Sequence, residues 1–316
     1  YKIDQDMSSR RMKRIKGHDF DLGFNILEVK DQSGSALSYT INKTMMRVDL
    51  PQPIKSGDKY TFSVKWYYNI NDRMQVGGRS GMEYFPEDGN YLYTIAQFFP
   101  RMAVYDDING WQNKQFLGRG EFTLPFGNYK VRIKVPSDHI VASTGELQNP
   151  GDVLTPEQVA LFEKSKTASE PVIIVSQEEV EKKEKSKAQN KVVWEYHAEH
   201  VRDFAFGTSR KLIWDAMGVE IGGKTVMAMS YYPKEANPLY EEYSTKVVAH
   251  TIKTYSKYTI DYPYPVAISV EASNGMEYPM ICFNYGRPNK DGTSSDRTKY
   301  GMISVIIHEA VSYTHL

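Results

Sequence analysis

The stretch from Val266 to Glu309 reads VAISVEASNGMEYPMICFNYGRPNKDGTSSDRTKYGMISVIIHE. Apolar residues at 266–270 and 280–285 predict two strands, and the run before His308 predicts a helix over about 298–309. Apolar side chains cover nearly every side of that helix, so we expect it to be buried in the middle of its domain. The stretch thus predicts a sheet covered by a helix.

Upstream of this stretch, tyrosine, valine and isoleucine recur at three- and four-residue steps from Asn237 onward. This spacing predicts an amphipathic helix, which must end before Tyr262-Pro263 because proline disfavours helical geometry in the residue before it. We place a domain boundary near Pro233, where the pattern changes.

The earlier part of the chain shows two-residue alternation, clearest at 60–66 and at 129–135, with frequent glycine and asparagine turn signals between. Such alternation predicts half-buried antiparallel strands, and many of them in succession predict a β-sandwich or saddle. Thr155-Pro156-Glu157-Gln158 combines an N-cap, a first-turn proline and a capping-box partner, so a helix should follow. The charge run at 178–187 predicts a solvated helical insertion or loop.

Composition limits the function classes. The chain has 316 residues, more than one core usually supports, and Lys+Arg and Asp+Glu are both 39, so nothing in the charge indicates nucleic acid or an anionic membrane as partner. The single cysteine, Cys282, lies in an apolar run and is expected to be an inert buried thiol. No apolar run reaches membrane-spanning length, so we expect a soluble chain. The sequence begins at Tyr1 and not at a methionine, so it does not decide whether a signal peptide precedes it. The compartment is therefore either the cytoplasm or the cell envelope or periplasm.

His308 and Glu309 match the first two residues of a helical zinc-peptidase motif. That chemistry needs a second histidine four residues on, so that two imidazoles on one helix face share the metal and the glutamate acts as base. Ser312 occupies the position of this second histidine. His315 lies about 10 Å from His308 along the helix axis, too far for the two to share one zinc ion. From the residues alone, His308 is better interpreted as a structural histidine at a helix end.

Several stretches outside this dipeptide resemble one family. They are 97–107, Trp111, 120–122, 129–136, 141–147, 201–206 with Ser209, 274–278 and 308–309. Together they resemble zinc aminopeptidases of the aminopeptidase N type, gluzincins with an H-E-x-x-H site and a G-x-M-E-N motif, in a bacterial branch. Asn274 stands where the motif usually has its first glycine, and Tyr278 replaces its asparagine. The resemblance covers nearly the whole chain from about Asp58.

The resemblance implies roles for individual residues. Glu277, with Gly275 and Met276 beside it, would bind the free amine of a peptide substrate, and Gln97 would contact the first substrate residue. His308 would be a zinc ligand and Glu309 the base that activates zinc-bound water. The alternatives without a function are an exposed loop carboxylate for Glu277 and an ordinary surface glutamine for Gln97. The second copy of Gly-Met-Glu-Tyr, at 81–84, is interpreted as coincidence.

We therefore expect a mainly β N-terminal sandwich or saddle domain followed by the truncated start of an α+β, thermolysin-like catalytic domain. The domains would be 1–232, with an incomplete N-terminus and a helical, charged insertion at about 155–190, and 233–309, while 310–316 would be a non-native tail. The parent would be a zinc aminopeptidase acting on peptide N-termini, and this fragment would be inactive because its metal site is incomplete. Two alternatives stay open: a non-catalytic binding or scaffold protein of the same fold, and an unrelated β-sandwich adhesion module, which requires 275–278 and His308 to lie far apart.

Overall fold

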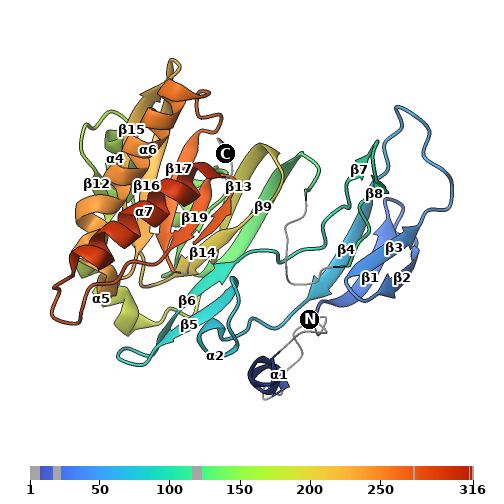
Figure 1. Ribbon diagram of the computed structural model, residues 1–316, viewed down its shortest axis with the longest axis horizontal. Helices are drawn as coiled ribbons and strands as arrows, with labels where there is room; N and C mark the ends of the chain where they lie inside the picture. The colour runs from blue at the N-terminus through green and yellow to red at the C-terminus, as the bar shows by residue number, and fades with distance from the viewer. Residues whose placement is uncertain (1–7, 17–22, 116–122, 273–274, 313, 315–316) are drawn as a thin grey trace. The chain divides into compact units, whose positions relative to one another are not determined.

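The structure is a computed structural model that describes residues 8–16, 23–115, 123–272, 275–312 and 314 (Figure 1). The chain divides into two compact units, one formed by 1–71 with 101–125 and the other by 72–100 with 126–316. Asn274 and His315 lie outside the described residues. None of the helices in the described ranges is long and apolar enough to cross a membrane.

In its described residues, the first unit consists of three two-stranded sheets and one helix. Its elements are α1 (Ser9–Lys16), β1 (Asn25–Asp31), β2 (Ser38–Asn42), β3 (Met45–Asp49), β4 (Phe62–Tyr67), β7 (Tyr105–Asp106) and β8 (Gly110–Trp111). β1 pairs with β4, β2 with β3, and β7 with β8, all antiparallel. Burial alternates residue by residue along β4, which confirms the half-buried strand predicted at 60–66.

The second unit carries the remaining strands and helices. Its strands are β5 (Gly81–Phe85), β6 (Asn90–Ile95), β9 (Gly127–Pro136), β10 (Ile140–Ser143), β11 (Glu146–Leu147), β12 (Val172–Val175), β13 (Lys191–Val201), β14 (Phe206–Ser209), β15 (Ile213–Ile221), β16 (Lys224–Tyr232), β17 (Val266–Glu271), β18 (Met276–Tyr278) and β19 (Ile281–Asn284). Its helices are α2 (Arg73–Val76), α3 (Pro150–Val153), α4 (Pro156–Ser165), α5 (Gln177–Ser186), the short η1 (Lys234–Ala236) and η2 (Tyr240–Ser244), α6 (Thr245–Tyr258) and α7 (Asp296–Ser312).

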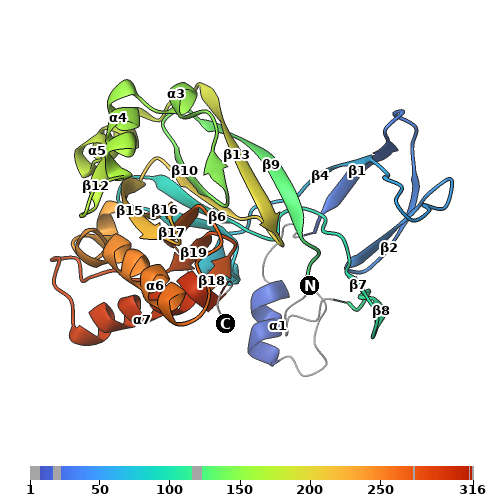
Figure 2. The ribbon, with the colours of Figure 1, turned by 90° about the horizontal axis from the view of Figure 1, so that it is seen from above.

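A six-stranded sheet in the order β12-β15-β16-β17-β19-β18 forms the core of this unit. β16, β17 and β19 run parallel, and β15 and β18 are antiparallel to their neighbours. Trp214 on β15 packs against Phe162 of α4, whereas the next residue, Asp215, bonds to Thr245 of α6. Because neighbouring residues of a strand face opposite sides, α4 covers one face of the sheet and α6 with α7 the other (Figure 2).

Two smaller sheets, β10-β14-β6-β5 and β11-β13-β9, complete the unit. At Gly207 on β14, an added Cβ would lie 3.4 Å from both Phe283 and Val270, so this strand lies directly on the larger sheet. The Thr144 hydroxyl donates a 2.9 Å hydrogen bond to the carbonyl of Pro279, in the β18–β19 turn. The β-rich part of the unit is therefore packed directly beside the motif at 275–278.

Most of the predicted elements are confirmed, and the molecule is mostly β with a few helices, as expected. α4 begins with the predicted capping box, in which Thr155 accepts from the Gln158 backbone N–H and the Gln158 side chain accepts from Thr155. The charge run forms α5, and the amphipathic helix is α6 with η2 before it. The boundary near Pro233 stays a prediction, and the six-stranded sheet joins strands from both sides of it.

The predicted burial of the last helix is wrong. α7 buries Met302, Ile306, Glu309 and Val311, while Ser304 and His308 are exposed. Its buried side lies against α6 and the strands β17, β18 and β19. Apolar residues on the other sides, such as Ile303 and Ile307, are only half-buried. The helix is thus covered on one side by the described residues, because it lies on the sheet as an outer layer (Figure 1).

Candidate functional site

His308 and Glu309 lie near the end of α7 and face different surroundings. The Glu309 side chain points to the sheet and is only 9% exposed, whereas His308 is exposed. Ile306 and Met302, about one and two turns before Glu309, are buried and hold the helix on the sheet. The sequence His-Glu therefore places a buried carboxylate and an exposed imidazole side by side.

The loop before β18 lies directly against Glu309. Gly275 has φ of +41°, and a Cβ built on it would lie 2.6 Å from Glu309 Oε1 and 4.0 Å from Val305 Cγ1. A real Cβ does not approach an oxygen so closely, so a side chain at this position would move the carboxylate end of the flexible Glu309 side chain. The Gly-Met-Glu-Tyr motif and the His-Glu dipeptide are therefore in contact. This excludes the adhesion-module alternative, which required them to lie far apart.

Glu277 and Met276 lie on opposite faces of β18. Glu277 is half-buried and pairs across the strands with Cys282, whereas Met276 is buried and pairs with Phe283. Burial raises the pKa of the Cys282 thiol to about 12, and the Glu309 and Glu277 carboxylates are close enough to act in the same direction. The thiol is thus protonated and inert, as predicted, and it lies near both carboxylates.

A pocket opens between the end of α7 and the sheet. Its lining includes Glu309 and Ala310 from the helix, Cys282 and Ile268 from the sheet, and Tyr262. The Glu309 carboxylate is the charged group of this lining, which mixes polar and apolar atoms. The space is about large enough for one water molecule, so Glu309 lies where a proton acceptor can meet a water beside the helix.

Gln97 lies two residues beyond the end of β6 and is exposed. Its φ is +53°, in the left-handed region that non-glycine residues rarely adopt. Strained backbone of this kind clusters at functional sites. Contact of Gln97 with a substrate stays a prediction.

The other copy of the tetrapeptide has a structural role. Glu83, on β5, is buried and accepts hydrogen bonds from Arg73 (2.9 Å) and from Arg287 (2.6 and 3.0 Å). Its carboxylate is occupied by two guanidinium groups, so it is not open to a substrate amine.

The donors present do not fit a catalytic zinc site. Such a site uses three protein ligands, and among the described residues no group of three donors includes His308. α7 continues to Ser312, so the position of a second histidine on the same face is occupied by a hydroxyl. The donor set of this helix thus supplies one imidazole, that of His308.

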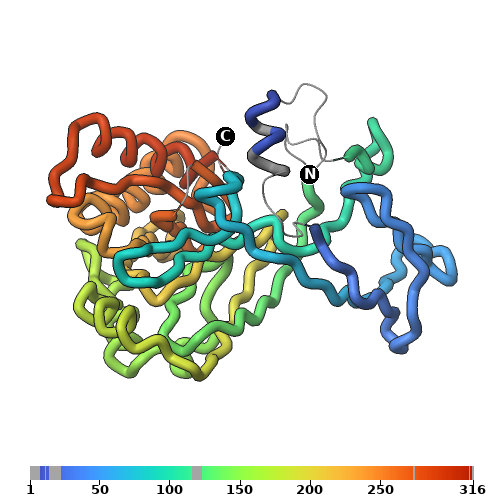
Figure 3. The backbone as a smooth tube through the Cα atoms, turned by 90° about the horizontal axis from the view of Figure 1, so that it is seen from below, coloured from blue at the N-terminus to red at the C-terminus, as the bar shows by residue number. Residues whose placement is uncertain are grey.

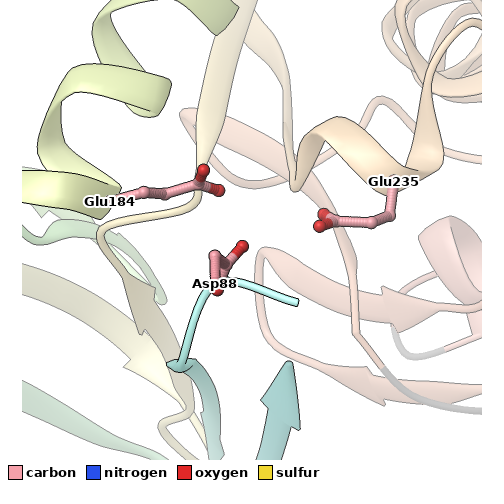
Figure 4. Close-up of side chains that lie close together, drawn as sticks. All are labelled: Asp88, Glu184 and Glu235. Carbon is pink, nitrogen blue, oxygen red and sulfur yellow. The ribbon is translucent and has the colours of Figure 1, made fainter. Parts of the chain in front are cut away.

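Within the described ranges, one group of three donors does meet, at Asp88, Glu184 and Glu235 (Figure 4). The ammonium of Lys211, which has no exposed surface, lies between them, 2.7 Å from Glu184 and 2.9 Å from Glu235, and also bonds to Asp88. A lysine thus occupies the position that a cation would take. Sequence reasoning missed this cluster, because its members come from a hairpin turn, α5 and η1 and share no local pattern.

Comparisons with known proteins identify the fold of this chain from similar solved structures. No protein-family model matches the chain, and no curated protein sequence does. The M1 zinc metallopeptidase of Deinococcus radiodurans superposes over 92% of this chain and 53% of its own, with 12% identity and a TM-score of 0.53. A mutant two-domain M1 zinc metallopeptidase bound to L-arginine matches 91% of this chain and 54% of its own, with 12% identity and a TM-score of 0.52.

Aminopeptidase A of Legionella pneumophila, in complex with aspartic acid, matches 91% of this chain and 29% of its own, with 11% identity and a TM-score of 0.53. The chain thus spans about half the length of the Deinococcus structure and less of the Legionella one. The fold of this chain is that of the N-terminal part of M1 zinc metallopeptidases.

Proposed function

We propose that the parent protein is a zinc-dependent aminopeptidase that removes N-terminal residues from peptides, and that residues 233–309 begin its catalytic domain. The observation that supports this most is the contact between Gly275 and Glu309, which joins the Gly-Met-Glu-Tyr loop to the His-Glu helix. The fold shared with M1 zinc metallopeptidases, one of them bound to L-arginine, agrees with it.

In this proposal Glu277 binds the substrate ammonium. A half-buried carboxylate opposite an ammonium gives a strong, oriented contact, and the requirement for a free amine restricts binding to chain ends. Glu309, buried beside it, accepts a proton, and Gln97 contacts the first substrate residue. His308 offers one imidazole, which does not suffice for a catalytic zinc site. We therefore assign no step to a metal and propose that these 316 residues bind peptide N-termini without hydrolysing them.

The test is a calorimetric titration of the 316-residue chain with L-alanine amide. We expect binding, and we expect Glu277→Gln to weaken it by about tenfold or more, because the charge that pairs with the ammonium is lost. Two controls isolate the amine contact: N-acetyl-alanine amide, which lacks the ammonium, should not bind, and Glu146→Gln, at an exposed position of β11, should bind as the unchanged chain does. Equal binding of the acetylated and free ligands would contradict the amine role of Glu277.

The inactivity of the chain has its own measurement. Hydrolysis of aminoacyl anilides should be absent with and without added zinc. Zinc-dependent turnover by these 316 residues would refute this part of the proposal.

A non-catalytic binding or scaffold protein of the same fold is the second candidate, and Ser312 favours it, because a hydroxyl stands where a catalytic zinc site needs an imidazole. The gene sequence that follows the codon of Glu309 separates the two. A second histidine four residues after His308 and a later glutamate ligand support the enzyme, and their absence supports the scaffold.

A further inference from the structure

The Thr144 hydroxyl is buried and joins two segments that are far apart in the sequence. It accepts a 3.1 Å hydrogen bond from the Ala205 N–H and donates a 2.9 Å bond to the Pro279 carbonyl. We propose that Thr144 is a positioning residue for Glu277, because its hydroxyl fixes the turn that follows the strand of this carboxylate. The inference rests on the proposed function for the role of Glu277, whereas the hydrogen bonds are independent of that function.

The direction of both hydrogen bonds is set by their partners. An amide N–H can only donate, so the hydroxyl accepts from Ala205. A carbonyl can only accept, so the one hydroxyl proton goes to Pro279. Thr144 itself is held in place, since its backbone N–H donates to the Ala205 carbonyl (2.9 Å) and the residue has no exposed surface. The hydroxyl is thus a fixed donor that points at the turn.

The turn that receives this bond has a backbone conformation that its own residues do not favour. Pro279 and Met280 are the two residues between Tyr278 and Ile281, which pair across β18 and β19. Met280 has φ of +68°, a conformation that suits glycine and that the second central residue of a type II turn adopts. Because methionine does not favour this conformation, the surroundings of the turn must stabilise it.

Two hydrogen bonds from outside the hairpin supply this stabilisation. The Met280 carbonyl accepts from the Ile268 N–H of β17 (2.8 Å), and the Pro279 carbonyl accepts from Thr144. β18 is three residues long and, in the described part of the sheet, it is the end strand and pairs with β19 alone. Its position therefore depends on the turn at its end, and Glu277 lies only two residues before Pro279.

The experiment compares three variants with the unchanged chain. Thr144→Val keeps the shape of the side chain and removes the hydroxyl, whereas Thr144→Ser keeps the hydroxyl. Thr208→Val is the matched control, because the buried Thr208 hydroxyl also donates to a backbone carbonyl, that of Ile140 (3.0 Å), and lies 3.2 Å from a second partner, His139 Nδ1. These partners belong to β10 and the residue before it, not to the β18–β19 turn.

Two measurements follow the hairpin. The first is the affinity for L-alanine amide, which depends on Glu277 in the proposed function. The second is the rate at which a thiol reagent labels Cys282, the single cysteine of the chain and the cross-strand partner of Glu277. Burial raises the pKa of this thiol to about 12, so the closed hairpin does not react and labelling reports its opening. The midpoint of thermal unfolding is recorded for each variant, so that a change in global stability is seen separately.

We expect Thr144→Val to weaken L-alanine amide binding and to speed the labelling of Cys282, each by about tenfold, which is the effect of one lost buried hydrogen bond. Thr144→Ser should stay within about twofold of the unchanged chain in both measurements, because it keeps the donor. Thr208→Val should do the same, although its unfolding midpoint should fall as that of Thr144→Val does. Equal effects of the two valine variants, or a serine variant that does not recover, overturn the proposal.

The test does not depend on the folding of one variant. If Thr144→Val does not fold, Thr144→Ala is compared with Thr144→Ser, because these two differ by the hydroxyl alone. Tighter binding and slower labelling of the serine variant then support the proposal, and equal behaviour of the two overturns it.

Failure of this proposal differs from failure of the proposed function. If the unchanged chain does not bind L-alanine amide, the amine role of Glu277 fails. The labelling rates of the same variants then decide whether Thr144 fixes the turn.

Discussion

Arg287 binds the fully buried carboxylate of Glu271 with two hydrogen bonds, from Nε to Oε1 (3.0 Å) and from Nη2 to Oε2 (2.9 Å). The same guanidinium donates two further bonds to Glu83 on β5. Glu271 ends β17, so Arg287 ties the β5–β6 hairpin, drawn in cyan in Figure 3, to the six-stranded sheet beside the candidate site.

Replacing Arg287 by methionine should destabilise the fold strongly. The change leaves Glu271 buried without its cation, and breaking a buried pair by removing one partner costs about 3–5 kcal/mol of unfolding free energy. Urea unfolding of the variant and of the unchanged protein measures this loss of unfolding free energy. Lys290→Met is the control, because Lys290 and Glu87 form an exposed pair with side chains 94% and 62% accessible, and its effect should stay below about 1 kcal/mol. Equal losses in both variants would contradict the structural role of Arg287.

Lys211→Met should create a cation site that the unchanged protein lacks. Without the Lys211 ammonium, three carboxylates remain with ligand oxygens within 4.8 Å of one another, and Lys234, 2.5 Å from Glu184, is then the one lysine left beside them among the described residues. We expect the variant to be destabilised, and we expect millimolar Ca²⁺ to raise its unfolding midpoint, since a cation that binds only the folded state stabilises it. The unchanged chain should show no such shift, because Lys211 fills the position. A calcium response of equal size in both proteins would show that the lysine does not occupy the cation position.

Asp215 should make stability depend on pH. Burial raises the pKa of this carboxyl to about 7 from 3.8, against the opposing effect of hydrogen bonds from Thr245 and Tyr232. The folded state therefore holds a proton between about pH 4 and 7 that the unfolded state has released. Stability from this group is complete below about pH 4 and is lost as pH rises to about 7, by up to about 4 kcal/mol.

Asp215→Asn removes this titration and keeps a similar shape. We expect the unfolding free energy of the variant, relative to the unchanged protein, to rise between pH 4.5 and 7.5, as followed by urea unfolding at several pH values. A difference that stays constant across this range would show that Asp215 does not carry the buried proton.

Ser312→His should strengthen zinc binding. α7 continues through Ser312, so an imidazole there shares a helix face with His308, the spacing at which two imidazoles bind one zinc ion. We expect the zinc dissociation constant, measured by competition with a chromophoric chelator, to fall by about tenfold or more. His308→Ala in the same background should abolish the gain. Unchanged affinity would mean that the two side chains do not converge.

Features that depend on a few neighbouring residues could be predicted from the sequence. The strand at 129–135, the capping box at Thr155 and the end of α6 before Tyr262-Pro263 follow from alternation, a local hydrogen bond and proline geometry. The two parts of the candidate site were also identified by their local motifs. Burial of α7 was mispredicted, because apolar composition does not say how many neighbours cover a helix.

The tertiary structure decided which distant groups meet. The sequence by itself determined that Gly275 belongs to a motif between two predicted strands and that Glu309 belongs to an apolar helix, and it showed Ser312 in place of a second histidine. Only the packing of α7 on the sheet placed the Glu309 carboxylate against Gly275, and only the meeting of the β5–β6 turn, α5 and η1 surrounded Lys211 with Asp88, Glu184 and Glu235. The physical reason is that local patterns fix backbone conformation, whereas contacts between remote residues depend on how close-packed layers fit together.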